Sequence, residues 1–228
     1  MTTLTRMYLN AHKRQGRKLL SNPQVMHAAV RAAFPPDVDE SATRVLWRVD
    51  QRQHEHVLYI VGPEEPDTGH LIEQAGWHTR PSQSLDYSRL LTSITLGQHW
   101  RFELVANPVK SLAGPRGTRG KVVPHVTPQQ QLMWLQERSA SAGFRLPGLQ
   151  ADAERGAVGS ADVIRRDNLS FVKNESNARS SKVSLRTARF SGILEVTDRE
   201  LLRRSLTQGI GRARAYGCGL LTMAKPEG

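Results

Sequence analysis

The chain has 228 residues, enough for one large domain or two small ones. Its 32 lysines and arginines exceed its 21 aspartates and glutamates, and the formal net charge of +11 indicates a polyanionic partner, most often nucleic acid, or else a basic ribosomal or surface protein. The only cysteine, Cys218, excludes an intrachain disulfide and a thiolate metal site, and no apolar run approaches the ~18 residues of a membrane span.

The first half of the chain begins with MTTLTRMYLN, which lacks the long apolar stretch of a signal peptide, so we expect a cytoplasmic protein without a membrane partner. Asn22 as N-cap and Pro23 at the first helical position mark the start of a helix, whereas the preceding AHKRQGRKLLSNP reads as a basic turn region. Apolar periodicity predicts, in chain order, a strand at 3–9, a helix at 22–34, strands at 43–50 and 56–62, a helix at 66–76 and a strand at 98–108.

The second half follows a connector at residues 108–126, which is rich in glycine, proline and basic side chains. The patterns beyond it predict a helix at 127–143, strands at 161–166, 169–173 and 182–196, a helix at 197–209 and a last strand at 218–224. The first of these helices lacks an obvious leading strand, unless residues 121–126 supply it.

The order of elements in each half is similar to the βαββαβ unit of ferredoxin-like domains. We therefore expect an α+β fold of two tandem ferredoxin-like (RRM-like) domains, with an N-terminal domain at 1–107, the connector at 108–126 and a C-terminal domain at 127–228. The 4 tryptophans lie within apolar patterns and lack the paired aromatics of an RRM stacking platform, so we assign them to the core.

A glycine-rich segment, GIGRARAYGCGLLTMAK, lies near the C-terminus. A dinucleotide-binding loop requires strand, glycines and helix in that order, but here a helix precedes the glycines and Arg214 occupies the place of the third glycine. Bare backbone N–H groups flanked by guanidinium groups suit a sugar–phosphate backbone, although an ordinary glycine-rich connection has the same composition. The residues of interest are Gly209, Gly211, Arg212, Arg214, Gly217 and Gly219.

Four segments together resemble one family. QGIGRARAYGCGLLTMA resembles the signature loop of the CRISPR RNA-processing endoribonucleases of the CasE type, members of the RAMP superfamily. MYLNAHKRQGRKLLSNPQVMHAAVRAAFP is similar to the opening strand and histidine-bearing helix of that family, WRFELVANPVKS to its F-x-L-x-A-N-P-x-K strand, and FSGILEVTD to the strand before its last helix. The resemblance covers residues 4 to 223.

This resemblance implies two ferredoxin-like domains and an enzyme that cuts CRISPR precursor transcripts within each repeat, just below a hairpin stem. It also implies that the protein stays on the crRNA hairpin beside the other subunits of the Cascade complex. Metal-independent cleavage of RNA uses the substrate 2′-hydroxyl as nucleophile and leaves a 2′,3′-cyclic phosphate and a 5′-hydroxyl. The sequence has no Asp/Glu group with the spacing of metal ligands, so we expect no metal and no cofactor.

His27 is the candidate catalytic residue, because an imidazole transfers protons near neutral pH and the resemblance places the family's histidine here. A histidine at the edge of a core would look the same in sequence. Relatives often carry a tyrosine three positions earlier, where this chain has Gln24, so the supporting group is open. Candidates for support are Gln24 itself, Tyr8, Lys13 and Arg14.

Basic residues of the second half and of the connector are candidates for holding the RNA stem, whose A-form shape is recognised mainly through its backbone. A solvated cationic face is the alternative for any of them. These residues are Arg165, Arg166, Lys173, Arg179, Lys182, Lys110, Arg116, Arg119 and Lys121. The competing function is a non-catalytic tandem RNA-hairpin-binding protein, and the role of His27 separates the two. A small-molecule nucleotide enzyme would need a phosphate motif that is absent.

Overall fold

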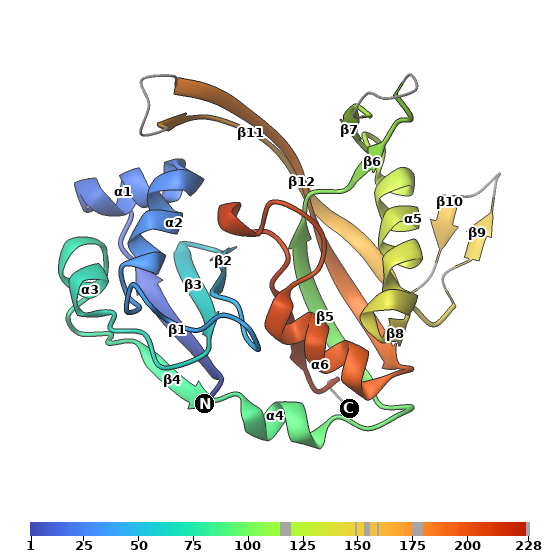
Figure 1. Cartoon of the computed structure of the whole chain (residues 1–228), viewed down its shortest axis with the longest axis horizontal. Helices are drawn as coiled ribbons and strands as arrows, with labels where there is room; N and C mark the ends of the chain where they lie inside the picture. The colour runs from blue at the N-terminus through green and yellow to red at the C-terminus, as the bar shows by residue number, and fades with distance from the viewer. Residues whose placement is uncertain (115–119, 149, 153–155, 159, 175–179, 227–228) are drawn as a thin grey trace. The chain divides into compact units, whose positions relative to one another are not determined.

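The computed structural model describes residues 1–114, 120–148, 150–152, 156–158, 160–174 and 180–226 (Figure 1). The chain forms two compact units that exchange segments near the C-terminus. Unit 1 contains Met1–Ile94, Leu206–Gly209 and Ala213–Leu220. Unit 2 contains Thr95–Ser205, Ile210–Arg212 and Leu221–Gly228.

Unit 1 has the ferredoxin-like order of elements. It consists of β1 (Thr3–Leu9), α1 (Arg14–Ser21), α2 (Pro23–Arg31), β2 (Leu46–Arg52), β3 (Glu55–Gly62), α3 (Gly69–Ala75), β4 (Gln83–Asp86) and α4 (Ser88–Ser93). The strands form an antiparallel sheet in the order β2-β3-β1-β4, and α1, α2 and α3 lie against it (Figure 1). The βαββαβ order predicted for this half is present, but its last strand is β4 and not the predicted strand at 98–108.

Helix α2 forms where the sequence places its start signals. The Oδ1 atom of Asn22 accepts hydrogen bonds from the backbone N–H groups of Gln24 at 2.9 Å and Val25 at 3.3 Å. Met26 and Val30 are buried one turn apart in the core of unit 1, together with Met7 and Leu9 of β1. This packing fixes the rotation of α2 and therefore the face on which His27 lies.

The prediction of a basic turn region at residues 11–23 is wrong, because residues 14–21 form α1. Its buried residues, Gly16 and Leu19, are three apart and lie on one face, while Arg17 and Lys18 are exposed. The short helix is therefore amphipathic, and the density of basic residues concealed its narrow apolar face. Strand β4 was also missed, because its four residues QSLD are mostly exposed and show no apolar alternation.

Unit 2 repeats the same order around β5 (His99–Ala106), α5 (Pro128–Ser139), β11 (Ala161–Asn174), β12 (Ser180–Val196), α6 (Arg199–Gln208) and β13 (Leu221–Ala224). The strand order is β11-β12-β5-β13, and β8 (Phe144–Arg145) also pairs with β12. Smaller elements of unit 2 are β6 (Val109–Ser111), β7 (Val122–Pro124), η1 (Ala140–Ala142), β9 (Gln150–Asp152) and β10 (Gly156–Val158), whereas η2 (Arg214–Tyr216) belongs to unit 1. The second ferredoxin-like unit is thus confirmed.

The domain boundary lies earlier than the sequence suggested. Strand β5 was placed at the end of the first domain, but it is the leading strand of unit 2, where Leu104 lies opposite Phe190 of β12 and Leu221 of β13. Residues 121–126 do not supply that strand, because β7 pairs with β6. Sequence alternation reveals that β5 is a strand, but it does not reveal which strands pair with it.

Two long strands replace the three short ones predicted between residues 161 and 196. Strand β11 pairs with β12 along its whole length, from Ala161 opposite Gly192 to Asn174 opposite Ser180. Strand β12 pairs with β5 only from Ala188 onward, so the β11–β12 hairpin continues beyond the sheet as a two-stranded arm (Figure 1). Polar residues in the middle of β11 made it look like two strands in the sequence.

The tryptophans are buried with one exception. Trp134 of α5 stacks on Phe190 of β12 with ring centroids 6.2 Å apart, and Trp47 and Trp100 are also buried. Trp77, which was assigned to the core, is 39% exposed and pairs through an isolated bridge with Arg80. Trp77 lies two residues beyond the end of α3 and is therefore not on the apolar face of that helix.

Candidate functional site

The glycine-rich segment folds as a loop whose backbone requires glycine. Positive φ angles occur at Gly209 (77°), Gly211 (83°), Gly217 (78°) and Gly219 (91°), and also at Ala213 (62°). At Gly217 a Cβ atom would lie 2.7 Å from Cζ3 of Trp47, so the backbone lies directly against that ring. The loop is therefore packed onto β2, and the glycine at 217 is a steric requirement.

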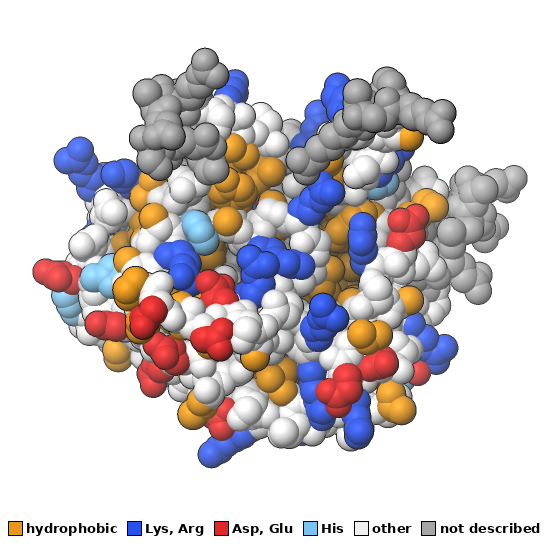
Figure 2. Space-filling model, viewed as in Figure 1, with side chains coloured by type: hydrophobic (Ala, Val, Ile, Leu, Met, Phe, Trp, Pro, Cys, Tyr) orange, Lys and Arg blue, Asp and Glu red, His pale blue; other side chains and the backbone are white. Residues whose placement is uncertain are grey.

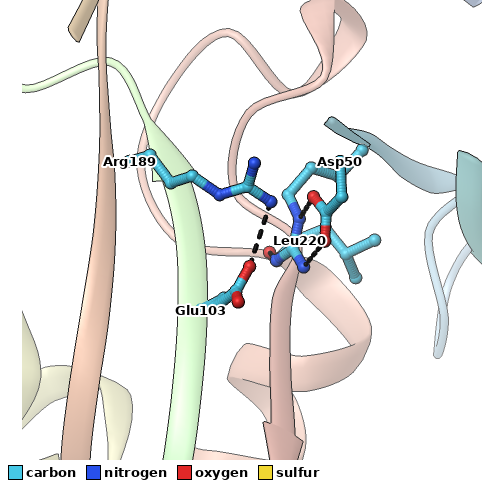
Figure 3. A network of polar contacts seen from close by, with 5 residues as sticks. Asp50, Glu103, Arg189 and Leu220 are labelled. Carbon is cyan, nitrogen blue, oxygen red and sulfur yellow. Dashed lines mark hydrogen bonds and ion pairs between the residues drawn. The ribbon is translucent and has the colours of Figure 1, made fainter. Parts of the chain in front are cut away.

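A buried ion pair fastens the end of this loop to the sheet of unit 1. Arg48 donates from Nε and NH2 to the two carboxylate oxygens of Asp50 at 2.7 and 2.9 Å, and from NH1 to the carbonyl of Leu220 at 3.0 Å (Figure 3). The exposed fractions of the Arg48 and Asp50 side chains are 2% and 0%. A buried carboxylate at Asp50 thus orients the guanidinium that holds Leu220.

The entrance of the loop is fastened to the same part of unit 1. The N–H of Arg44 donates to the carbonyl of Thr207 at 2.9 Å, and Nε2 of Gln208 donates to the carbonyl of Ala42 at 2.8 Å. Both ends of the loop are therefore bonded to β2 or to the residues that precede it. This explains why residues 206–209 and 213–220 group with the N-terminal half of the chain.

The turn at the centre of the loop packs against the helix that carries His27. Residues Arg214–Tyr216 form η2, which contacts both α2 and β2 within unit 1. NH2 of Arg214 donates to the carbonyl of Gly209 at 3.0 Å, while its Nε is buried and has no partner among the described residues. Burial, and then the charge of Arg44, lower the pKa of Arg214. A cation in this state gains from a bound anion.

His27 is half-buried on α2, and no hydrogen bond from the described part of the chain holds its ring. Its Nδ1 atom is buried without a partner, which leaves Nε2 as the nitrogen available to a substrate. Burial lowers the pKa of His27, and the positive charge of Arg31 lowers it further, while Glu40 acts in the opposite direction. The lowered pKa favours the neutral imidazole, the form that accepts a proton.

The supporting candidates differ in position. Gln24 is half-buried and lies one turn before His27 on α2, so the two share a face of the helix. Lys13 donates from Nζ to the carbonyl of Glu73 at 2.8 Å and thereby caps the end of α3. Arg14 is exposed on α1.

Tyr8 does not lie with His27. Met7 and Leu9 point into the core beside α2, so Tyr8, between them on β1, points to the other face of the sheet. The guanidinium of Arg80 lies 3.4 Å from the centroid of the Tyr8 ring and pairs with Glu55 at 2.6 Å. Arg80 thus contacts Tyr8 on the face of the sheet opposite to the helix that carries His27.

The candidate RNA-binding side chains that the structure describes are exposed, as contact with phosphates requires. They are Arg165, Arg166, Lys182, Lys110, Lys121 and, in the loop, Arg212. Arg165 pairs with Asp167 at 3.0 Å, and NH1 of Arg166 donates to the carbonyl of Val126 at 3.1 Å. Arg116, Arg119 and Arg179 lie outside the described residues, as does the side chain of Lys173, which belongs to β11.

Basic side chains occur over both units, on the surface formed by α1 and on that formed by α5 and α6 (Figure 2). In the part of the chain that the structure describes, no group of three or more histidine, cysteine or acidic residues has an arrangement that could hold a metal ion. No helix among the described residues is long and apolar enough to cross a membrane.

Arg48 and Asp50 were not among the residues predicted from the sequence. Their alternation within LWRVD places both on one face of β2, which is a detectable signal for a charged pair inside an apolar strand. Their function in holding the loop depends on Leu220, 172 residues further along the chain, and no local pattern contains that contact.

Comparison with known proteins identifies the family. The family model described as "CRISPR associated protein" matches residues 3–225. The CRISPR-associated endoribonuclease Cse3 of Thermus thermophilus is 31% identical over 224 residues, which cover 97% of this chain and 99% of that protein. The Cascade subunit CasE of Escherichia coli is 29% identical over 130 residues, covering 54% of this chain and 56% of that protein.

A solved structure supports the same assignment. Cse3 of Thermus thermophilus bound to an RNA that represents a pre-cleavage complex superimposes with a TM-score of 0.74 at 30% identity, covering 98% of both chains. The superposition extends over nearly the whole of each protein. The chain therefore belongs to the CRISPR-associated protein family that includes the Cse3 and CasE proteins.

Proposed function

We propose that this protein is a metal-independent endoribonuclease that cuts CRISPR precursor RNA within the repeat, at the base of a hairpin. Its relatives support the substrate, since one is named an endoribonuclease and is solved with RNA before cleavage. One observation carries the proposal. His27 makes no side-chain hydrogen bond among the described residues, and its helix, α2, packs against the Arg214 turn of the glycine-rich loop.

The neutral imidazole of His27 accepts the proton of a ribose 2′-hydroxyl. The 2′-oxygen then attacks the adjacent phosphorus in line and expels the 5′-oxygen, which takes up a proton from water, while the imidazolium of His27 returns its proton to the solvent. The products are a 2′,3′-cyclic phosphate and a 5′-hydroxyl. His27 suits the first step because burial and Arg31 lower its pKa and so favour the unprotonated form.

Charge on the phosphate increases during the attack, and the loop supplies the groups that stabilise it. Arg214 has a buried Nε without a partner in the described chain, and its NH2 is oriented by the carbonyl of Gly209. A guanidinium already fixed in place loses little freedom when it binds an oxyanion. Gln24, which shares the α2 face with His27, is the group positioned to orient the ribose through its side-chain amide.

After cleavage the protein stays on the crRNA hairpin within Cascade. This part of the proposal rests on the Escherichia coli relative, which is named a Cascade subunit, and on the exposed basic residues of unit 2. Contacts to several phosphates slow product release, so we expect single-turnover behaviour with the hairpin product.

The test is incubation of the protein with a repeat hairpin in EDTA, followed by analysis of the cut ends. We expect cleavage that leaves a cyclic phosphate and a 5′-hydroxyl. The variant His27→Ala should cut roughly 10²–10⁴-fold more slowly and bind the hairpin as the parent does. A requirement for magnesium, or a free 3′-hydroxyl on the product, would refute the mechanism. Unchanged cleavage by the variant would exclude His27, and hairpin binding without any cleavage would favour the non-catalytic alternative.

A further inference from the structure

Unit 2 contains a groove of about 490 Å³ between the start of α5 and the base of the β11–β12 arm. Arg166 and Asn168 of β11 and Arg186 of β12 line it, together with Ile164, with Val126 just before α5 and with Gln131 in its first turn. The ion pair of Arg165 and Asp167 also lines the groove, so the charge of Asp167 is already balanced. This volume lies within the range of small-ligand sites, which span roughly 300–1,000 Å³. It is far too small for an RNA duplex.

Strand register explains why the polar side chains converge. Asn168 lies directly opposite Arg186, and Arg166 lies opposite Ala188, so these residues share one face of the ladder. Ala188 and Phe190 follow on the same face of β12, and Phe190 stacks on Trp134 of α5. The face that is apolar beneath α5 thus becomes cationic where the helix begins.

The groove also contains apolar surface that is exposed to water. Ile164 and Val126 line it with exposed fractions of 56% and 51%. The register of β11 shifts between Val163 and Arg165, so Ile164 is the extra residue of a bulge. Bulges redirect side chains and occur often beside functional sites. An aromatic ring that covered these two side chains would remove apolar area from water.

A phosphate alone does not match this surface, because it would leave Ile164 and Val126 exposed. A nucleotide presents both an anion and a flat ring with polar edges. The guanidinium groups of Arg166 and Arg186 suit the phosphate. The side-chain amide of Asn168 is exposed, makes no hydrogen bond among the described residues, and can donate to and accept from a base edge.

We propose that this groove binds one unpaired nucleotide of the RNA, with its base on Ile164 and Val126, its base edge on Asn168 and its phosphates on Arg166 and Arg186. The inference rests on the proposed function for its RNA partner. It adds a second point of recognition, because bases inside a duplex are stacked and paired and cannot enter. The groove would thus distinguish a hairpin with a single-stranded extension from a hairpin that ends at its stem.

The test compares the affinities of synthetic repeat hairpins that end flush at the stem with those of the same hairpins carrying a 5′ or a 3′ single-stranded extension. A 2′-deoxy substitution at the cut position prevents cleavage. We expect Arg186→Ala and Asn168→Ala to weaken binding of one extended hairpin roughly tenfold, the effect of losing one charge-assisted or well-placed hydrogen bond. Binding of the flush hairpin should change less than about twofold.

Two controls separate charge from recognition. Arg199→Ala removes an exposed arginine of the same unit that lies outside the groove, and it should affect both kinds of RNA equally. Asn168→Ala leaves the net charge unchanged, so its effect should persist at high salt, whereas Arg186→Ala should lower the log–log salt slope by ~0.7. A 4-thiouridine in the extension should form a photo-crosslink to the peptide that contains Ile164.

Equal losses on flush and extended hairpins would overturn the inference in favour of a contact to stem phosphates. Parent-like affinities for every RNA, with no crosslink to the Ile164 peptide, would overturn it in favour of a groove that takes no RNA. The test is separable from that of cleavage. A protein that cuts the repeat while its groove variants bind normally refutes only the groove, and selective binding without cleavage refutes only the catalytic proposal.

Discussion

Replacement of Arg48 by methionine should destabilise unit 1 by about 3–5 kcal/mol, because it leaves the carboxylate of Asp50 buried without its cation. This loss of stability is at the upper end of the range for a single substitution. The Asp50 side chain is 0% exposed, so water cannot replace the lost partner. The carbonyl of Leu220 loses its donor as well, which adds about 1–3 kcal/mol if no other group takes over.

A double variant separates the charge effect from the loss of packing. Arg48→Met combined with Asp50→Val removes both charges and replaces them with apolar side chains, and valine at position 50 is closer in volume to aspartate than leucine would be. Buried ion pairs replaced in this way often cost nothing, so most of the loss should be recovered. The residual cost should be about 1–3 kcal/mol, the cost of an unsatisfied Leu220 carbonyl.

The assay is urea unfolding together with amide hydrogen exchange. The midpoint of unfolding should fall in the single variant and return most of the way in the double variant. Exchange of the peptide that contains residues 213–220 should accelerate in both, because both lose the bond to Leu220. A single variant destabilised by less than about 1 kcal/mol, or a double variant no more stable than the single, would show that Asp50 does not depend on Arg48.

Three further outcomes follow from the same contacts. Gly217→Ala should reduce stability by more than Gly97→Ala, because both positions have positive φ but only Gly217 lies against a ring, that of Trp47; thermal unfolding of the two variants compares them. Asn22→Ala should cost about 1 kcal/mol in urea unfolding, because it removes the acceptor that caps α2. The value of kcat/KM should fall with decreasing pH as His27 becomes protonated. Because Glu40 raises the pKa of His27, the variant Glu40→Gln should move this decline to lower pH. Parent-like stability in the first two cases, or a decline that moves to higher pH in the third, would contradict the reasoning.

The same pKa shift has a consequence for stability. Burial lowers the pKa of folded His27 below its ordinary value, so the unfolded chain binds a proton more readily than the folded one. The contribution of neutral His27 to stability is therefore present above the ordinary histidine pKa and declines as the pH falls through the window between the two pKa values. The sign is the same as for activity, and His27→Ala would abolish both dependences.

Local patterns were sufficient for some elements and insufficient for others. The start of α2 follows from Asn22 and Pro23, and the predicted N-cap is present in the structure. Strand β4 and helix α1 were missed because neither has a strong apolar period: β4 is mostly exposed, and α1 buries only Gly16 and Leu19. Both are stabilised by tertiary packing, which a sequence window does not contain.

The assignment of β5 shows a different limit. Its alternation is visible in the sequence, but the strands that pair with it lie far away along the chain, so the unit to which it belongs could not be predicted from local sequence.

The prediction of site residues was limited in the same way by the absence of tertiary information. Tyr8 is near α2 in sequence, yet the period of two on β1 turns its side chain to the opposite face from Met7 and Leu9. Sequence proximity selected Tyr8, and strand geometry separates it from His27.

Residues 206–209 and 213–220, far along the chain, are part of unit 1. Trp47 packs against Gly217, and Arg48 of the same strand bonds to Leu220, so a fragment ending at Ile94 would leave an exposed indole and a buried ion pair facing water. β2 is also the edge strand of its sheet. An edge with apolar surface and no cover tends to aggregate. The loop therefore covers β2 and also packs against α2, the helix that bears His27. Removal of residues 213–220 would expose both elements.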